Sequence, residues 1–103
     1  MPLRISLTKE AKADLDQLRE YLMPLSPQGL QNVVAALEKR VALTAEHPAS
    51  GRPSPRADVR EAIEPKYGFL IPYSVNGEVL HILRIYRGMR KPLDYQTLPS
   101  PDE

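Results

Sequence analysis

The chain has 103 residues, enough for one domain around a single core, and it contains no cysteine and two histidines. Disulfides, thiolate metal sites and thiol nucleophiles are therefore excluded, and no metal or other cofactor is expected. The net charge of +1 is too small to attract nucleic acid or membrane on its own, and no stretch reaches the apolar length of a membrane span, so we expect a cytoplasmic protein.

The start of the chain predicts a strand followed by a helix. Residues 3–7 alternate leucine or isoleucine with polar residues, which is the pattern of a short half-buried strand. Thr8 can then cap a helix over about residues 9–22, where apolar residues recur at helical spacing. The acidic residues of this helix, Asp14 among them, are interpreted as its solvent-facing side. Pro24 ends the helix.

A second helix is predicted after a short link. Ser26 can cap it, and Pro27 suits its first position, where the missing N–H costs nothing. Because the link is short, the two helices are expected to form an antiparallel hairpin. Residues 47–58 contain three prolines and one glycine and are expected to form an ordered loop or a connector.

The second half of the chain predicts three more strands. Residues 59–64 alternate in polarity, and residues 69–75 and 78–86 are rich in β-branched and aromatic residues. Asn76-Gly77 lies between the last two strands and predicts a β-hairpin with a type I′ turn. The last strand has apolar residues on both faces, which indicates a position in the middle of the sheet.

The element order is therefore β-α-α-β-β-β, an α+β fold. A four-stranded sheet of mixed or antiparallel strands is expected to carry the α-hairpin on one face. The other face is expected to be open to solvent or to a partner.

A basic group follows the apolar part of the last strand: Arg84, Tyr86, Arg87, Arg90 and Lys91. An arginine in an apolar strand needs an anionic partner. For Arg84 the partner is either an external anion or one carboxylate of Asp58, Glu61 and Glu64. Strict alternation places Arg84 and Tyr86 on one face of the strand and Arg87 on the other.

The remaining charged and aromatic residues differ in their expected roles. Arg87 and Arg90 lie beyond the apolar run and are expected to contact solvent or a partner. Arg60 lies on the preceding strand, where it either joins the same surface or is a solvated charge. The histidines are interpreted as structural residues and the remaining tyrosines as packing residues. No catalytic motif emerges from these residues.

Four segments in order resemble the ParE branch of the ParE/RelE toxin superfamily: ISLTKEAKADLDQLREYL, SPQGLQNVVAALE, EHPASGRPSPRADVRE and FLIPYSVNGEVLHILRIYRGMRKP. The resemblance extends over residues 3 to about 92. It implies a RelE/ParE-like toxin domain over residues 1–92, with a small mixed sheet whose first strand lies beside the last. Residues 93–103 are then a tail, expected to be flexible unless bound.

The resemblance also implies the toxin half of a type II toxin–antitoxin system, of the kind linked to plasmid stabilisation. ParE-type toxins inhibit DNA gyrase and are neutralised by a ParD-like antitoxin, so no direct sequence-specific DNA binding by this chain is implied. RelE-type toxins instead cleave messenger RNA on the ribosome.

RNA cleavage requires groups that activate a 2′-hydroxyl and stabilise a pentacovalent phosphate. RelE-like toxins use basic residues of the sheet and a C-terminal tyrosine or histidine, and the resemblance aligns the basic positions with Glu61, Ile63 and Leu70. Two apolar groups and a carboxylate cannot stabilise that phosphate. Arg90 and Tyr95 do match the family's last arginine and tyrosine.

We therefore predict a gyrase-binding toxin that is not an enzyme. Its partner-binding residues are predicted to be Arg60, Arg84, Tyr86, Arg87 and Arg90. One alternative is a ribosome-dependent ribonuclease that uses Arg84, Arg87, Arg90 and Tyr95. The other is a degenerate module that only binds an antitoxin.

Overall fold

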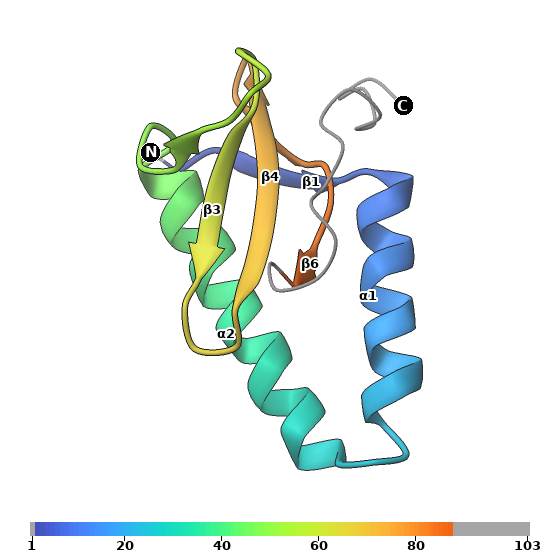
Figure 1. Cartoon of the computed structure of the whole chain (residues 1–103). Helices are drawn as coiled ribbons and strands as arrows, with labels where there is room; N and C mark the ends of the chain where they lie inside the picture. The colour runs from blue at the N-terminus through green and yellow to red at the C-terminus, as the bar shows by residue number, and fades with distance from the viewer. Residues whose placement is uncertain (1, 88–103) are drawn as a thin grey trace.

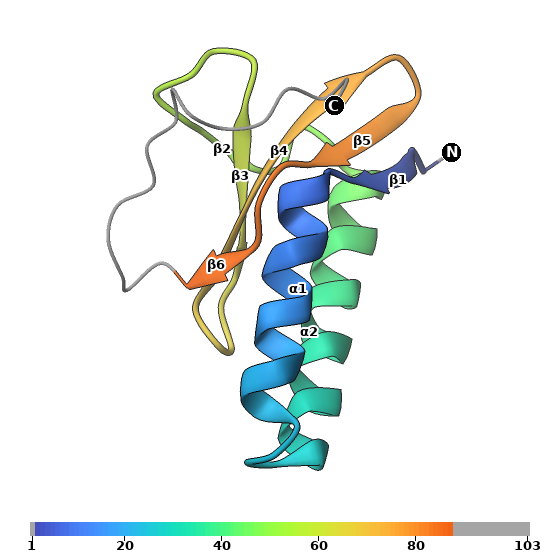
Figure 2. The same cartoon turned by 90° about the vertical axis from the view of Figure 1, so that its right-hand side faces the viewer.

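Two helices lie on one side of a mixed β-sheet in the computed structural model, which describes residues 2–87 (Figures 1 and 2). The arrangement confirms the predicted α+β fold, with an α-hairpin packed on one sheet face. The predictions for Arg90, Lys91, Tyr95 and the tail 93–103 concern positions outside the described residues.

The helices begin where the sequence places their caps. Helix α1 spans Lys9–Leu22, and the Thr8 side chain accepts a hydrogen bond from the Ala11 N–H. Helix α2 spans Pro27–Glu46, and Ser26 accepts from the Gly29 N–H at 2.9 Å. These bonds satisfy backbone donors that a helix leaves free at its N-terminus. The predicted caps are confirmed.

The sheet joins the two ends of the described chain. Its strands run in the order β1 (Arg4–Leu7), β5 (Val79–Ile82), β4 (Phe69–Asn76), β3 (Arg60–Glu64) and β2 (Arg52–Pro53), with β6 (Tyr86–Arg87) also paired to β4. β1 is parallel to β5, and the other pairs are antiparallel. The first strand therefore lies beside the last long one, which is a central strand as predicted. Two short strands, β2 and β6, add to the four that the sequence predicts.

The hairpin between β4 and β5 differs from the prediction by one residue. Asn76 pairs with Val79, so the two loop residues are Gly77 and Glu78 and not Asn76 and Gly77. Gly77 has φ +62°, and no non-glycine residue in the described part of the chain has positive φ. One positive φ, at the first central residue, is typical of a type II′ turn, whereas type I′ needs two.

The predicted strand over residues 78–86 is interrupted. Ile82 pairs with Tyr73, whereas Tyr86 pairs with Leu70, so three residues of this segment lie opposite two residues of β4. The extra residue makes a β-bulge between β5 and β6, and side-chain alternation changes face there. Tyr86 consequently lies on the other face from the one that strict alternation predicts.

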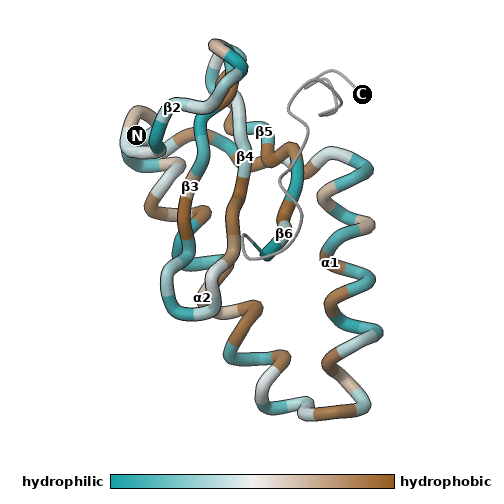
Figure 3. Tube along the Cα trace, viewed as in Figure 1, coloured by the Kyte–Doolittle hydropathy of each residue, from teal (hydrophilic) through white to brown (hydrophobic). Residues whose placement is uncertain are grey.

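The core lies between the sheet and the helices. Its buried residues include Val33 and Leu37 of α2 together with Ile71, Tyr73 and Ile82 of the sheet. Hydrophobic and hydrophilic segments alternate along both helices, as expected for helices with one buried side (Figure 3). The loop before β3 is tied to this core, because the Tyr73 hydroxyl donates to the Pro48 carbonyl and accepts from the Gly51 N–H.

Candidate functional site

The sheet face away from the helices is called the outer face. Cross-strand pairing places Glu61 beside Pro72, Ile63 beside Leu70, Leu70 beside Tyr86, and Ser74 beside His81, and these residues alternate with the core residues of the same strands. The face is not uniformly exposed. Ile63 is 40% exposed, whereas Glu61, Pro72 and Ser74 are buried. The expectation was a face open to solvent or to a partner, and at these three positions the face is not open to solvent.

An ion pair lies at the β2 side of the outer face. β2 pairs Arg52 with Glu61, and the Arg52 Nε lies 2.9 Å from Glu61 Oε1. The Glu61 side chain is 8% exposed, whereas the Arg52 side chain is 54% exposed. A buried carboxylate requires such a partner, because an unpaired charge in this position would carry a large desolvation cost.

Tyr86 lies near this pair. Burial raises the pKa of the Tyr86 phenol, the negative charge of Glu61 raises it further, and the positive charges of Arg52 and Arg84 act in the opposite direction. A raised pKa keeps the phenol neutral at physiological pH. Tyr86 can therefore donate a hydrogen bond or stack, but it is a poor proton acceptor.

Arg84 has a partner that the sequence analysis did not predict. Its Nε and Nη2 donate to the two carboxylate oxygens of Asp14 on α1, at 2.7 and 3.0 Å. The prediction of a partner among Asp58, Glu61 and Glu64 is wrong, and so is the interpretation of Asp14 as a solvent-facing residue, since its side chain is only 12% exposed. The bonds from Asp14 raise the pKa of the Arg84 guanidinium.

The sequence does contain an indication that Asp14 faces the core side of α1 and not solvent. Asp14 lies three residues after the fully buried Ala11 and four before Leu18, so it belongs to the apolar stripe of α1 and not to the opposite side. An acidic residue on a buried stripe requires a cation or several donors. Its distant partner, Arg84, could not be chosen from spacing alone.

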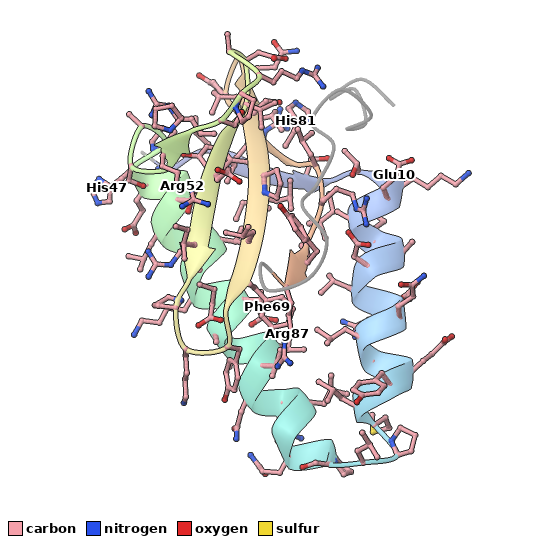
Figure 4. All side chains as sticks on the ribbon, viewed as in Figure 1. Glu10, His47, Arg52, Phe69, His81 and Arg87 are labelled. Carbon is pink, nitrogen blue, oxygen red and sulfur yellow. The ribbon has the colours of Figure 1, made fainter. Side chains whose placement is uncertain are left out.

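The other basic residues do not gather around Tyr86. Arg60 donates from Nη1 to the Gly51 carbonyl at 2.8 Å and so holds the loop before β3. Arg87 is exposed, and its guanidinium lies over the Phe69 ring, 5.5 Å from the centroid (Figure 4). As neighbours on β6, Arg87 and Tyr86 lie on opposite faces, and the bulge places Arg87 on the helix side, opposite Phe69. The role of these residues in partner binding stays a prediction.

An apolar groove lies on the helix side of the sheet, between the two helices and β1. Its volume is about 260 Å³, and it is lined by Ile5, Leu7, Leu15, Val34, Leu37, Val41, Ile82 and Ile85, with Arg19 and Glu38 as charged residues. Within residues 2–87, β1 pairs only with β5, so its other edge carries no strand. The sequence analysis did not predict this groove, because it forms where separate segments of the chain meet: β1, the two helices, and the segment from β5 to β6.

The described part of the chain contains neither a metal-binding cluster nor a membrane-spanning helix. No group of three or more His, Asp or Glu side chains there is arranged to hold a metal ion. Neither α1 nor α2 is long and apolar enough to cross a membrane.

Comparison with known proteins places this fold among toxins. Residues 5–92 match the model of the family described as ParE toxin of type II toxin-antitoxin system, parDE. The chain is 34% identical over 76 residues to Y4kP of Sinorhizobium fredii, a protein named as a candidate toxin, with 74% of this chain and 79% of that protein covered.

Solved structures agree with these matches. A chain of the chromosomal ParDE system from P. aeruginosa superposes with a TM-score of 0.73 at 28% identity, covering 82% of this chain and 95% of that one. A chain of the RelBE2 toxin–antitoxin complex from Mycobacterium tuberculosis gives a TM-score of 0.56 at 22% identity, covering 84% of this chain and 99% of that one, which shows a shared fold.

Proposed function

The chain belongs to the ParE toxin family of type II toxin–antitoxin systems, and from this membership we propose that it is a toxin that inhibits DNA gyrase by binding. We further propose that a ParD-like antitoxin neutralises it. In this proposal the chain is not an enzyme, and its outer face contacts the target.

The outer face supports binding over RNA cleavage. The positions that the family resemblance aligns with the basic residues of RelE-like nucleases are Glu61, Ile63 and Leu70, and all three belong to the outer face. Ile63 and Leu70 are neighbours there, and the Glu61 charge is compensated by Arg52. A pentacovalent phosphate needs positive charge or hydrogen-bond donors at the site where negative charge develops. An apolar pair and a carboxylate provide neither, and they are suited to a protein surface.

Tyr86 also supports binding. A general base must accept a proton near neutral pH, whereas the pKa of Tyr86 is raised above its ordinary value of 10.0 by burial and by Glu61. A neutral tyrosine on a partly apolar face is instead a typical contact residue of protein interfaces.

The groove supports an antitoxin. Its lining is almost entirely apolar, and an amphipathic segment that places apolar side chains at helical spacing could fill it, with charged side chains at Arg19 and Glu38. The free edge of β1 lies beside it and could accept an extended segment of the same partner. An antitoxin bound in this way would not cover the outer face, which lies on the opposite side of the sheet.

The proposed target is tested with purified, antitoxin-free protein in two assays: gyrase supercoiling with DNA cleavage, and translating ribosomes with messenger RNA. Gyrase inhibition with intact RNA is expected. RNA cleavage with unaffected gyrase, lost in the Tyr95→Phe variant, would overturn the proposal in favour of the ribonuclease alternative. Folded protein that is silent in both assays would favour the degenerate module.

The predicted basic site has a separate test. Charge reversal at Arg87 and Arg90 together is expected to weaken toxicity or antitoxin binding by roughly tenfold or more, because complementary charges orient partners and accelerate their association. Arg87 is exposed, so we expect the Arg87→Glu, Arg90→Glu variant to stay folded, as judged by circular dichroism. Normal toxicity together with normal antitoxin affinity would reject these residues as a binding site.

A further inference from the structure

The bulge between β5 and β6 decides which side chains reach the outer face. A regular continuation of the β4–β5 register would place Tyr86 opposite Phe69, on the helix side of the sheet. With the extra residue, Tyr86 lies opposite Leu70 and joins Ile63 on the outer face. Which side chains that face contains therefore depends on the contacts that stabilise the bulge.

Pro72 makes regular pairing at this point incomplete. The Leu83 N–H donates to the Pro72 carbonyl at 2.9 Å, but proline has no N–H with which to return the bond. The Leu83 carbonyl is instead satisfied by the N-cap residue of α1, because the Thr8 hydroxyl donates to it at 2.9 Å. Leu83 is fully buried, so this carbonyl has no access to water as a substitute.

Asp14 of α1 binds further donors of the bulge. Its Oδ2 accepts from the Ile85 N–H at 2.9 Å and from the Arg84 Nε at 2.7 Å, and its Oδ1 accepts from Arg84 Nη2 at 3.0 Å. One carboxylate thus binds both residues that are displaced from regular pairing. Hydrogen bonds to an ionised group are stronger than neutral ones, and the guanidinium fork fixes their direction.

We propose that Asp14 is a positioning residue for the target-contacting face: by binding Arg84 and Ile85 from α1, it holds the bulge that places Tyr86 on the outer face. The inference rests on the proposed function of that face. Asp14 lies on the helix side and reaches the outer face only through the bulge, so its effect on target binding is indirect.

The test compares Asp14→Asn with Asp16→Asn. Asparagine has nearly the shape of aspartate but can no longer accept both guanidinium bonds together with the Ile85 N–H. Asp16 is an exposed residue of the same helix, 3.9 Å from Arg19, so its variant removes the same charge without touching the bulge. Asp14→Glu, which restores the carboxylate, is the conservative variant and also serves if Asp14→Asn does not fold.

Two NMR measurements report directly on whether the bulge is intact. Hydrogen exchange of the Ile85 amide is expected to accelerate by roughly tenfold or more in Asp14→Asn, because its charged acceptor is lost. Titration of the Tyr86 phenol is expected to move toward its ordinary pKa as the ring leaves its half-buried position near Glu61. Asp16→Asn should change neither, and Asp14→Glu should recover part of both.

Toxicity is measured on the same variants in cells and in the gyrase assay. A change in both NMR readouts together with at least tenfold weaker gyrase inhibition would support both the positioning role and the proposed target face. An unchanged Ile85 amide and Tyr86 titration in folded Asp14→Asn would overturn the positioning role, whatever the toxicity. If both NMR readouts change but gyrase inhibition stays complete, Asp14 does hold the bulge, and the outer face is rejected as the target contact.

Discussion

The Thr8 hydroxyl makes two hydrogen bonds, one within its own helix cap and one to a distant strand segment. Its oxygen accepts from the Ala11 N–H as the cap of α1, and its proton is donated to the Leu83 carbonyl, 75 residues further along the chain. The side chain is almost fully buried. The first bond can be predicted from the sequence, because capping is local. The second exists because Pro72 lacks the N–H that a regular strand would provide.

Replacing Thr8 with valine removes both bonds at nearly constant volume. We expect the free energy of unfolding to fall by about 2–4 kcal/mol, the sum of a lost cap and an unsatisfied buried carbonyl. Denaturant unfolding measures this. Thr8→Ser keeps the hydroxyl and should recover most of the loss. A Thr8→Val variant as stable as the parent would show that the two bonds of the hydroxyl do not stabilise the fold.

Two tyrosines, the buried Tyr73 and the half-buried Tyr86, predict a loss of stability at alkaline pH. Burial is the largest effect on both Tyr73 and Tyr86, and it raises each pKa above the ordinary value of 10.0. Between that value and the raised one, the folded state binds more protons than the unfolded state, so the free energy of unfolding falls as pH rises. Below the ordinary pKa the effect of these groups on stability is complete and constant.

The Tyr73→Phe variant tests this assignment in denaturant unfolding from pH 7 to 11. At neutral pH it should be less stable by about 1–3 kcal/mol, because the Gly51 N–H and the Pro48 carbonyl lose their partner. Above pH 10 its stability should fall less steeply than that of the parent. Parallel curves for the two proteins would show that Tyr73 does not contribute to the alkaline loss.

At the scale of elements, the β4–β5 hairpin shows how one residue changes a turn. Asn-Gly is a strong hairpin signal, and the hairpin is present, but the glycine occupies the first loop position and the asparagine is the last residue of β4. The longer pairing in the structure uses Asn76 and Val79 as a cross-strand pair. A type II′ turn then requires positive φ only at Gly77.

Gly77→Ala should therefore destabilise the hairpin through its backbone alone, since an added Cβ would meet no atom within 4 Å. We expect a loss of about 1 kcal/mol in the free energy of unfolding, and a smaller loss for Gly77→Asn, because asparagine tolerates positive φ better. Thermal or denaturant unfolding separates the two. An alanine variant as stable as the parent would contradict the turn assignment.

At the scale of the whole molecule, the sheet separates two surfaces. The apolar groove lies on its helix side, against β1, and the outer face lies on the other side. In the proposed function the antitoxin takes the first surface and the target the second. A single layer of strands thus allows the two kinds of binding to be changed independently.

Val34 and Ala35 test that separation. Val34 lines the groove, whereas Ala35 is the next residue on α2 and is exposed outside it. Val34→Asp should weaken antitoxin binding by roughly tenfold or more, because a charge is placed on an apolar contact, and gyrase inhibition should persist. Ala35→Asp adds the same charge to the same helix and should change neither. Titration calorimetry with the antitoxin measures the difference, and an unaffected affinity in Val34→Asp would exclude the groove.

Much of the fold was predictable because its signals are local. The caps at Thr8 and Ser26, the periodic helices and the alternating strands depend on residues within one or two turns of each other. The candidate site was less predictable. The basic residues near the last strand are adjacent in sequence, yet Arg84 is bound by α1, and Tyr86 lies on the face opposite to the one that strict alternation predicts.

The sequence by itself determined the two helices, the four longer strands, the order of these elements and the toxin family, because each rests on short-range patterns or on the order of segments. Tertiary structure alone decided the partner of Arg84, the bulge, the side of the sheet on which Tyr86 lies, and the groove. The physical reason is that an ion pair, a register and a cavity are set by where distant segments meet. Asp14 and Arg84 are 70 residues apart, and only packing of α1 against the broken strand brings their charges together.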